Sequence, residues 1–152
     1  MIETLLAAFP YVKAAIGATP TEVADSEKLL GIHFPDSFRR YLTSFGYLSF
    51  SDDCELYGLG QGVPKYFDLT RRTIEERTIL LPNIPTYFLP FLNDGSGNHF
   101  CVDLRRETPD PPVVLWHHEA GTDRSSNFVI ESFSKFLVEL AKQAPNRRLE
   151  RP

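Results

Sequence analysis

Three side chains suited to metal binding or nucleophilic chemistry alternate near the middle of the sequence. His99, Cys101 and Asp103 occupy every second position, so they project from one face of a β-strand. His117 and His118 must point to opposite faces of a later strand, so at most one of them can join this group. Imidazole and thiolate suit a metal ion, and a Cys–His pair suits covalent catalysis. A buried thiol beside a hydrogen-bonded histidine is the commoner outcome, so we predict no catalytic residue, metal or cofactor.

Acidic side chains form a second group in a short connection. Asp52, Asp53 and Glu55 place three carboxylates within four residues. Such a cluster can hold a divalent cation or face a cationic partner, and it is also typical of a turn exposed to water.

The segment from Asp94 to Asn98 resembles a phosphate-binding loop only superficially. A nucleotide cradle opens a helix, whose terminal amides bind the anion, whereas strand-forming residues follow here. Ser96 lies between two adjacent glycines, which is not the spacing of a nucleophile elbow. The segment therefore predicts a β-hairpin turn.

The strands that position these groups run from Thr86 to Leu104 and from Pro112 to Glu119. Apolar residues on both sides of the turn and a third strand soon afterwards predict the centre of an antiparallel sheet. A last short strand is predicted around Phe128 and Ile130.

Helices are predicted before and after these strands. Residues 3–16 have apolar side chains at helical spacing, and Thr19-Pro20-Thr21-Glu22 has the form of a capping box for a helix that stops at Gly31. A further helix is predicted from Pro35 to Gly46. Another should run from Asp68 or Thr70 to about Ile79, with Leu69 and Ile74 pointing inward. A last helix should follow Ser132, and its apolar stripe should cover the sheet.

Length and composition bound the class of protein. The chain has 152 residues, a net charge of −4 and two cysteines, Cys54 and Cys101, without metal-site spacing. We expect one domain over residues 1–145 and a flexible tail over 146–152. Neither a signal peptide nor a membrane span is predicted, so we expect a cytoplasmic protein with reduced thiols. The acidic balance disfavours direct nucleic-acid binding.

Four blocks of sequence, in order, resemble the SMI1/KNR4 family of the SUKH superfamily. These blocks are Phe34–Gly46, Leu89–Leu104, Pro112–Glu119 and Ser132–Leu137. The resemblance covers about residues 20–140. It implies an α+β fold with a central, mainly antiparallel β-sheet and with N-terminal helices and a C-terminal helix packed around it.

The resemblance also implies a function without catalysis. Many bacterial relatives are immunity proteins that bind and neutralise a cognate polymorphic toxin, often a nuclease, and fungal relatives are regulators of cell-wall synthesis. We therefore expect an immunity protein whose partner is a toxin. The alternatives are a regulatory or scaffold protein that binds a cellular partner, and an enzyme or metal protein that uses His99, Cys101 and His117.

An inhibitor of a basic toxin needs an acidic, partly apolar surface. The candidate partner-binding residues are acidic side chains near turns and sheet edges, together with aromatic side chains that can anchor an interface. They are Asp52, Asp53, Glu55, Tyr57, Tyr66, Asp94, Trp116 and Glu119.

Overall fold

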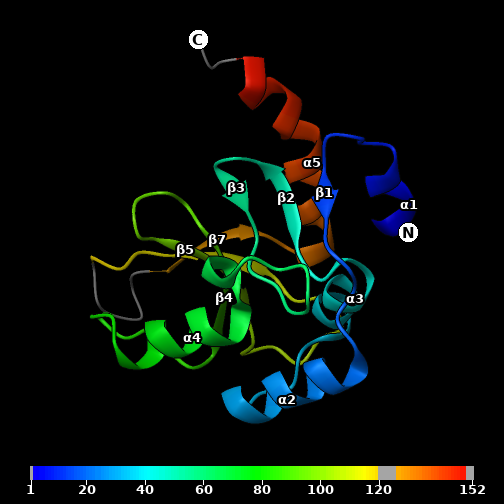
Figure 1. Ribbon diagram of the computed structural model, residues 1–152. Helices are drawn as coiled ribbons and strands as arrows, with labels where there is room; N and C mark the ends of the chain where they lie inside the picture. The colour runs from blue at the N-terminus through cyan, green and yellow to red at the C-terminus, as the bar shows by residue number, and fades with distance from the viewer. Residues whose placement is uncertain (1, 120–125, 150–152) are drawn as a thin grey trace.

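The computed structural model describes residues 2–119 and 126–149. The elements follow in the order α1 (Ile2–Ala7), β1 (Lys13–Ala14), α2 (Pro20–Leu30), α3 (Asp36–Phe45), β2 (Leu48–Ser51), β3 (Cys54–Glu55), the 3-10 turn η1 (Lys65–Phe67), α4 (Leu69–Thr78), β4 (Phe88–Asn93), β5 (His99–Asp103), β6 (Val113–Trp116), β7 (Ser126–Ile130) and α5 (Phe133–Leu149) (Figure 1). None of the helices in these residues is long and apolar enough to cross a membrane.

The strands form two antiparallel sheets, in the order β1-β2-β3 and β4-β5-β6-β7. The hairpin predicted around Asp94 joins β4 to β5, and β6 and β7 extend the same sheet. The Tyr57 amide donates to the Phe91 carbonyl at 2.8 Å, which ties the segment after β3 to β4. The predicted α+β class is therefore confirmed, with the strands divided between two sheets.

Local signals account for the bounds of α2 and α3. The Thr19 side chain accepts from the Glu22 amide, and the Glu22 carboxylate accepts from the Thr19 amide, which completes the predicted capping box. Gly31 ends α2 in a left-handed conformation with φ 67°, which glycine adopts without steric penalty. Gly46 follows α3 with φ 69° and ψ −48°, a positive φ that also favours glycine although the conformation differs from that of Gly31.

The first helix is shorter than predicted, and the last helix extends into the segment predicted as a tail. The helix predicted over residues 3–16 stops at Ala7, because a proline at position 10 cannot continue the hydrogen-bond ladder, and residues 13–14 pair with β2 instead. Helix α5 continues to Leu149, so residues 146–149 of the predicted tail are helical. The remaining tail residues, 150–152, lie outside the described part of the chain.

Aromatic rings dominate the main core, which lies between the helices and one face of the four-stranded sheet. The Phe133 ring of α5 is fully buried, and its centroid lies 5.1 Å from those of Phe38 and Phe91. Val102 and Val113 join this cluster. Their neighbours alternate to the other sheet face, where a smaller cluster contains Ile84, Phe88, Cys101, Val114 and Trp116.

Gly58 permits a close backbone contact beside this core. A Cβ at position 58 would lie 1.9 Å from the Gly46 carbonyl oxygen and 2.9 Å from the Tyr47 Cα. Because these are backbone atoms, no side-chain rotation relieves the clash. We expect Gly58→Ala to lower the free energy of unfolding by about 3 kcal/mol or more, measured by denaturant titration.

Gly31→Ala is the matched control for this prediction. Its φ of 67° disfavours alanine, but no atom lies within 4 Å of the added Cβ. We expect Gly31→Ala to lower the free energy of unfolding by only about 1 kcal/mol, because of the unfavourable backbone conformation. Equal losses at positions 58 and 31 would show that the backbone contact at Gly58 is not restrictive.

Candidate functional site

The surroundings of His99 and Cys101 favour the protonated form of the thiol. Both side chains are fully buried on β5. The His99 Nε2 lies 2.9 Å from the Tyr57 hydroxyl and 3.6 Å from Glu76 Oε1. Burial raises the pKa of the Cys101 thiol well above its ordinary value, and the Glu76 and Asp103 carboxylates act in the same direction. A nucleophilic or metal-binding cysteine needs the opposite shift.

The other side chains considered for chemistry contact different partners. Hydrogen bonds join Asp103 to Arg105, His117 to Asn127 and His118 to Asn98. Within residues 2–119 and 126–149, no cluster of three or more His, Cys, Asp or Glu side chains could hold a metal ion. The three alternating side chains, His99, Cys101 and Asp103, therefore have different hydrogen-bond partners.

The buried His99 side chain makes stability depend on pH. Burial, helped by the positive charge of Arg72, lowers the pKa of His99 to about 4, so its imidazole is neutral at pH 7. An unfolded histidine takes up its proton near pH 6.5, so the unfolded state binds more protons between pH 6.5 and 4. Stability therefore falls as the pH decreases through this window. We expect the titration of His99 to lower the free energy of unfolding by about 2 kcal/mol between pH 7 and pH 5.

Chemical denaturation of the wild type and His99→Gln at both pH values measures this effect. The variant should lose less stability on acidification, because glutamine does not titrate. Glu76 has the opposite effect on stability. Desolvation raises its pKa, so the folded state binds the proton more tightly than the unfolded state, and this contribution to stability increases as the pH falls. Glu76→Gln should steepen the acid loss. The same acid loss in the wild type and His99→Gln would contradict the assignment.

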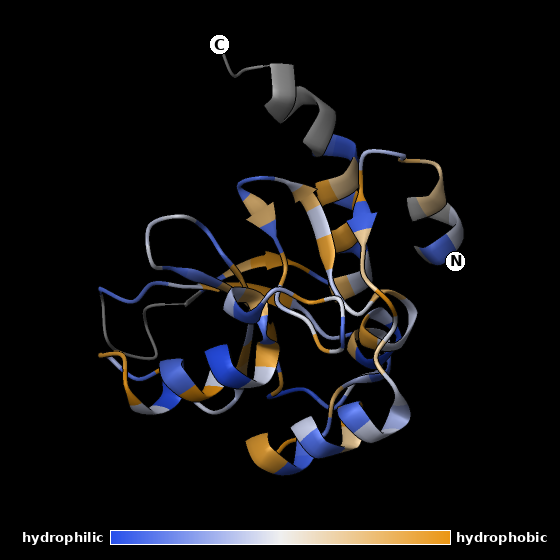
Figure 2. Ribbon diagram, in the orientation of Figure 1, coloured by the Kyte–Doolittle hydropathy of each residue, from blue (hydrophilic) through white to orange (hydrophobic). Residues whose placement is uncertain are grey.

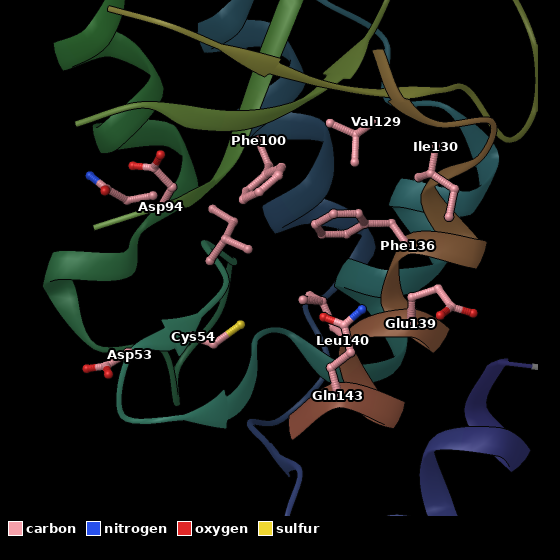
Figure 3. Close-up of a pocket in the computed structure, with 12 residues that line it drawn as sticks. Asp53, Cys54, Asp94, Phe100, Val129, Ile130, Phe136, Glu139, Leu140 and Gln143 are labelled. Atoms are coloured by element: carbon pink, nitrogen blue, oxygen red, sulfur yellow. The ribbon is translucent and has the colours of Figure 1, made fainter. Parts of the chain in front are cut away.

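A groove of about 440 Å³ lies where β3, the β4–β5 hairpin, β7 and α5 meet (Figure 3). We name it the acidic groove. Figure 3 shows Asp53 and Asp94 on one side and Glu139 across from them. Its apolar floor comes from largely buried side chains, including Leu92, Phe136 and Leu140. A negative rim around an apolar floor suits a basic side chain with an apolar stem.

Three separate elements bring the carboxylates of the acidic groove together. Asp53 is exposed in the turn between β2 and β3, and Asp94 is exposed in the β4–β5 turn. Glu139 lies on α5 immediately before Leu140, whose burial fixes that face of the helix against the protein. The packing of α5 therefore sets where the third carboxylate lies.

Hydrogen bonds within the hairpin turn keep Asp94 ionised. Its Oδ1 accepts from the Ser96 amide and hydroxyl, each at 2.8 Å, and from the Asn98 amide at 3.2 Å. Partial burial tends to raise the pKa of Asp94, but these bonds outweigh it and hold the pKa below the ordinary value. Glu139 lies 3.6 Å from the Lys142 ammonium, and both side chains are largely exposed, so this pair is weak. Asp94 and Glu139 therefore contribute negative charge to the rim at neutral pH.

Six of the eight predicted partner-binding residues do not line the acidic groove, and four of these six are at least partly exposed. Asp52 is exposed in the same turn as Asp53. Glu55 accepts a hydrogen bond from the Tyr47 hydroxyl at 2.6 Å. Tyr66 is exposed beneath the Arg72 guanidinium, and Glu119 is exposed at the end of the first described segment. Their role as partner contacts stays a prediction.

The prediction that Tyr57 and Trp116 contact a partner is wrong for this structure. Their side chains are 0% and 1% exposed. Tyr57 follows β3 into the core and bonds His99, while Trp116 packs on the sheet face of Cys101. Both aromatic rings therefore stabilise the fold.

Sequence reasoning missed Glu139 and Phe100 as groove residues. Phe100 precedes Cys101 on β5 and lines the groove from the opposite sheet face. Glu139 directly precedes Leu140 on the predicted apolar stripe of α5, so it marks the edge of the helix face that packs on the protein. The position of Glu139 beside the apolar stripe predicts that it lies at the edge of the packed helix face. Its closeness to Asp53 could be recognised only after α5 was placed beside the β2–β3 turn.

The geometry defines an α+β domain with two antiparallel sheets and an acidic concavity at one end. The family model of the SMI1 / KNR4 family (SUKH-1) matches residues 17–139. The chain belongs to this family. A search of curated proteins finds no match.

Proposed function

We propose that this chain is a cytoplasmic, non-enzymatic immunity protein that binds and neutralises a cognate polymorphic toxin. The observation that carries the proposal is the acidic groove, in which carboxylates from three elements surround an apolar floor. Such a surface complements a basic partner and speeds its association. Membership of the SMI1/KNR4 family supports a binding function of this kind.

A nuclease is the class of toxin that this charge pattern favours. Enzymes that act on nucleic acid present lysine and arginine to the phosphate backbone. The rim carboxylates Asp53, Asp94 and Glu139 would pair with such groups and cover the surface that holds the substrate. The same carboxylates and the net charge of −4 disfavour direct binding of nucleic acid or an anionic membrane by this chain.

The environment of the thiol supports binding rather than catalysis. Cys101 is buried, and its pKa is raised. His99 is neutral and is held by Tyr57. Cys101→Ala should therefore leave the protective activity of the protein unchanged, provided that the variant folds.

Co-expression in bacterial cells tests the proposal. The reading frame encoded beside this gene is expressed with or without this chain, and colony survival is counted. The proposal expects the neighbouring product to be toxic and this chain to restore survival. A toxic neighbour that kills equally in the presence of this chain would overturn the proposal.

A further inference from the structure

The buried face of helix α4 carries two polar side chains beside Leu69, and apolar side chains are exposed on α4 and just after it. Thr73 and Glu76 are buried, whereas Ile74 and Ile79 are 37% and 68% exposed. A surface helix of a globular protein normally has the reverse pattern. The prediction that Ile74 points inward is therefore wrong, because the buried face of α4 meets the polar contacts of His99 and the Ser26–Thr70 hydrogen bond.

Exposed apolar side chains gather at this place. Nine large apolar side chains are exposed in the part of the chain that the structure describes, and five of them lie on α2, on α4 or just after α4: Leu29, Ile74, Ile79, Leu80 and Leu81. Figure 2 shows hydrophobic colour at the end of α2 and in separate segments within and just after α4, which is otherwise mainly hydrophilic. Clustered exposure of this kind marks an interaction surface, whereas single exposed apolar residues do not.

A groove of about 710 Å³ runs between the two helices, and Leu29, Ile74 and Ile79 line it. We name it the α2–α4 groove. Its charged lining residues are Arg71 and four acids, Glu22, Asp25, Asp68 and Glu75. Glu75 accepts from Arg71 at 3.0 Å and from Arg72 at 2.8 Å. The other three carboxylates leave the rim with a negative surplus.

We propose that the α2–α4 groove binds an amphipathic helix of a partner protein whose apolar face is flanked by lysine and arginine. The floor between two helices accepts the apolar side chains of a third helix, and the rim pairs with its basic flanks. This surface shares no residue with the acidic groove. Figure 1 shows α2 and α4 at the opposite end of the molecule from β3 and the outer part of α5. The α2–α4 groove is therefore a second surface, separate from the proposed toxin site.

The rim charge selects this occupant over two others. A second copy of the chain would bring Glu22, Asp25 and Asp68 against the same three side chains, and like charges at an interface oppose binding. An anionic membrane would be repelled for the same reason. A basic helix is attracted by the same carboxylates that repel a second copy of the chain and an anionic membrane.

The probe is a synthetic leucine–lysine peptide of about 14 residues, roughly four helical turns, patterned to form an amphipathic helix. It is titrated into ¹⁵N-labelled full chain, and amide chemical shifts are followed. We expect the shifts to centre on α2 and α4. Leu29→Ser combined with Ile79→Ser should weaken binding at least tenfold, and Asp25→Lys should weaken it without removing an apolar contact.

Phe128→Ser is the matched control, because Phe128 on β7 is as exposed as Leu29, at 68%. It should bind the peptide like the wild type. A leucine–glutamate peptide of the same pattern should bind at least tenfold more weakly. Shifts centred on the acidic groove, or unchanged affinity in the Leu29/Ile79 variant, would overturn the proposal. A wild-type dimer that this variant converts to a monomer would assign the groove to a second copy and also overturn it.

Discussion

Replacing Asp53 and Glu139 with lysine is expected to weaken binding of the proposed toxin by about 100-fold at low salt. Each reversal changes an attraction to a repulsion at the rim of the acidic groove, and about 1.4 kcal/mol per site corresponds to tenfold. The loss should shrink in high salt, because the screening length falls from about 10 Å at 0.1 M to about 3 Å at 1 M. Titration calorimetry at two salt concentrations measures both effects.

Two further variants test whether the loss of affinity comes from the charge of the acidic groove or from net charge and stability. Glu107→Lys reverses one charge, as Asp53→Lys alone does, in the exposed β5–β6 connection at the opposite end of β5 from the Asp94 turn, and it should alter affinity less than threefold. Asp94→Asn removes a charge but keeps an Oδ1 acceptor for the turn. It should weaken binding without loss of stability beyond about 1 kcal/mol. Equal effects at Glu107 and Asp53 would show that net charge alone matters.

Phe133→Ala is expected to give the largest loss of stability, about 3–5 kcal/mol. The ring is fully buried, with centroids 5.1 Å from Phe38 and Phe91 and 5.7 Å from Tyr41, so its removal leaves a cavity that no one neighbour can fill. The melting temperature should fall by roughly 10 °C. Thermal and denaturant unfolding measure the change.

Phe128→Ala is the control for this prediction, because that phenylalanine is 68% exposed. Its stability should change by less than about 0.5 kcal/mol. A similar loss in both variants would mean that the aromatic cluster does not form the centre of the core.

Features decided within a few residues were predictable from the sequence. The capping box at Thr19, the glycines at 31 and 46 and the Asp94 turn act through local backbone geometry, and each lies where the pattern placed it. The hairpin and its alternation also placed His99 and Cys101 on one face of β5. Local chemistry thus defines most of the elements in the described residues.

Features decided by packing between distant segments were not predictable. Helical period alone turns Ile74 inward, but α4 meets the protein through Leu69, Thr73 and Glu76. Nothing in the sequence near Tyr57 distinguishes a surface anchor from a ring that reaches His99. The acidic groove joins residues 53, 94 and 139, whose proximity exists only after the two sheets and α5 have packed together.

Photo-crosslinking from within the acidic groove tests most directly where this chain holds its partner. A photoreactive amino acid replaces Gln143, which is exposed and lines the groove, or Glu107 as the distant control. The chain is then irradiated with the product of the neighbouring reading frame. We predict a covalent adduct from position 143 and none from position 107. No adduct at position 143, or equal yields at both positions, would contradict the assignment of the groove as the partner site.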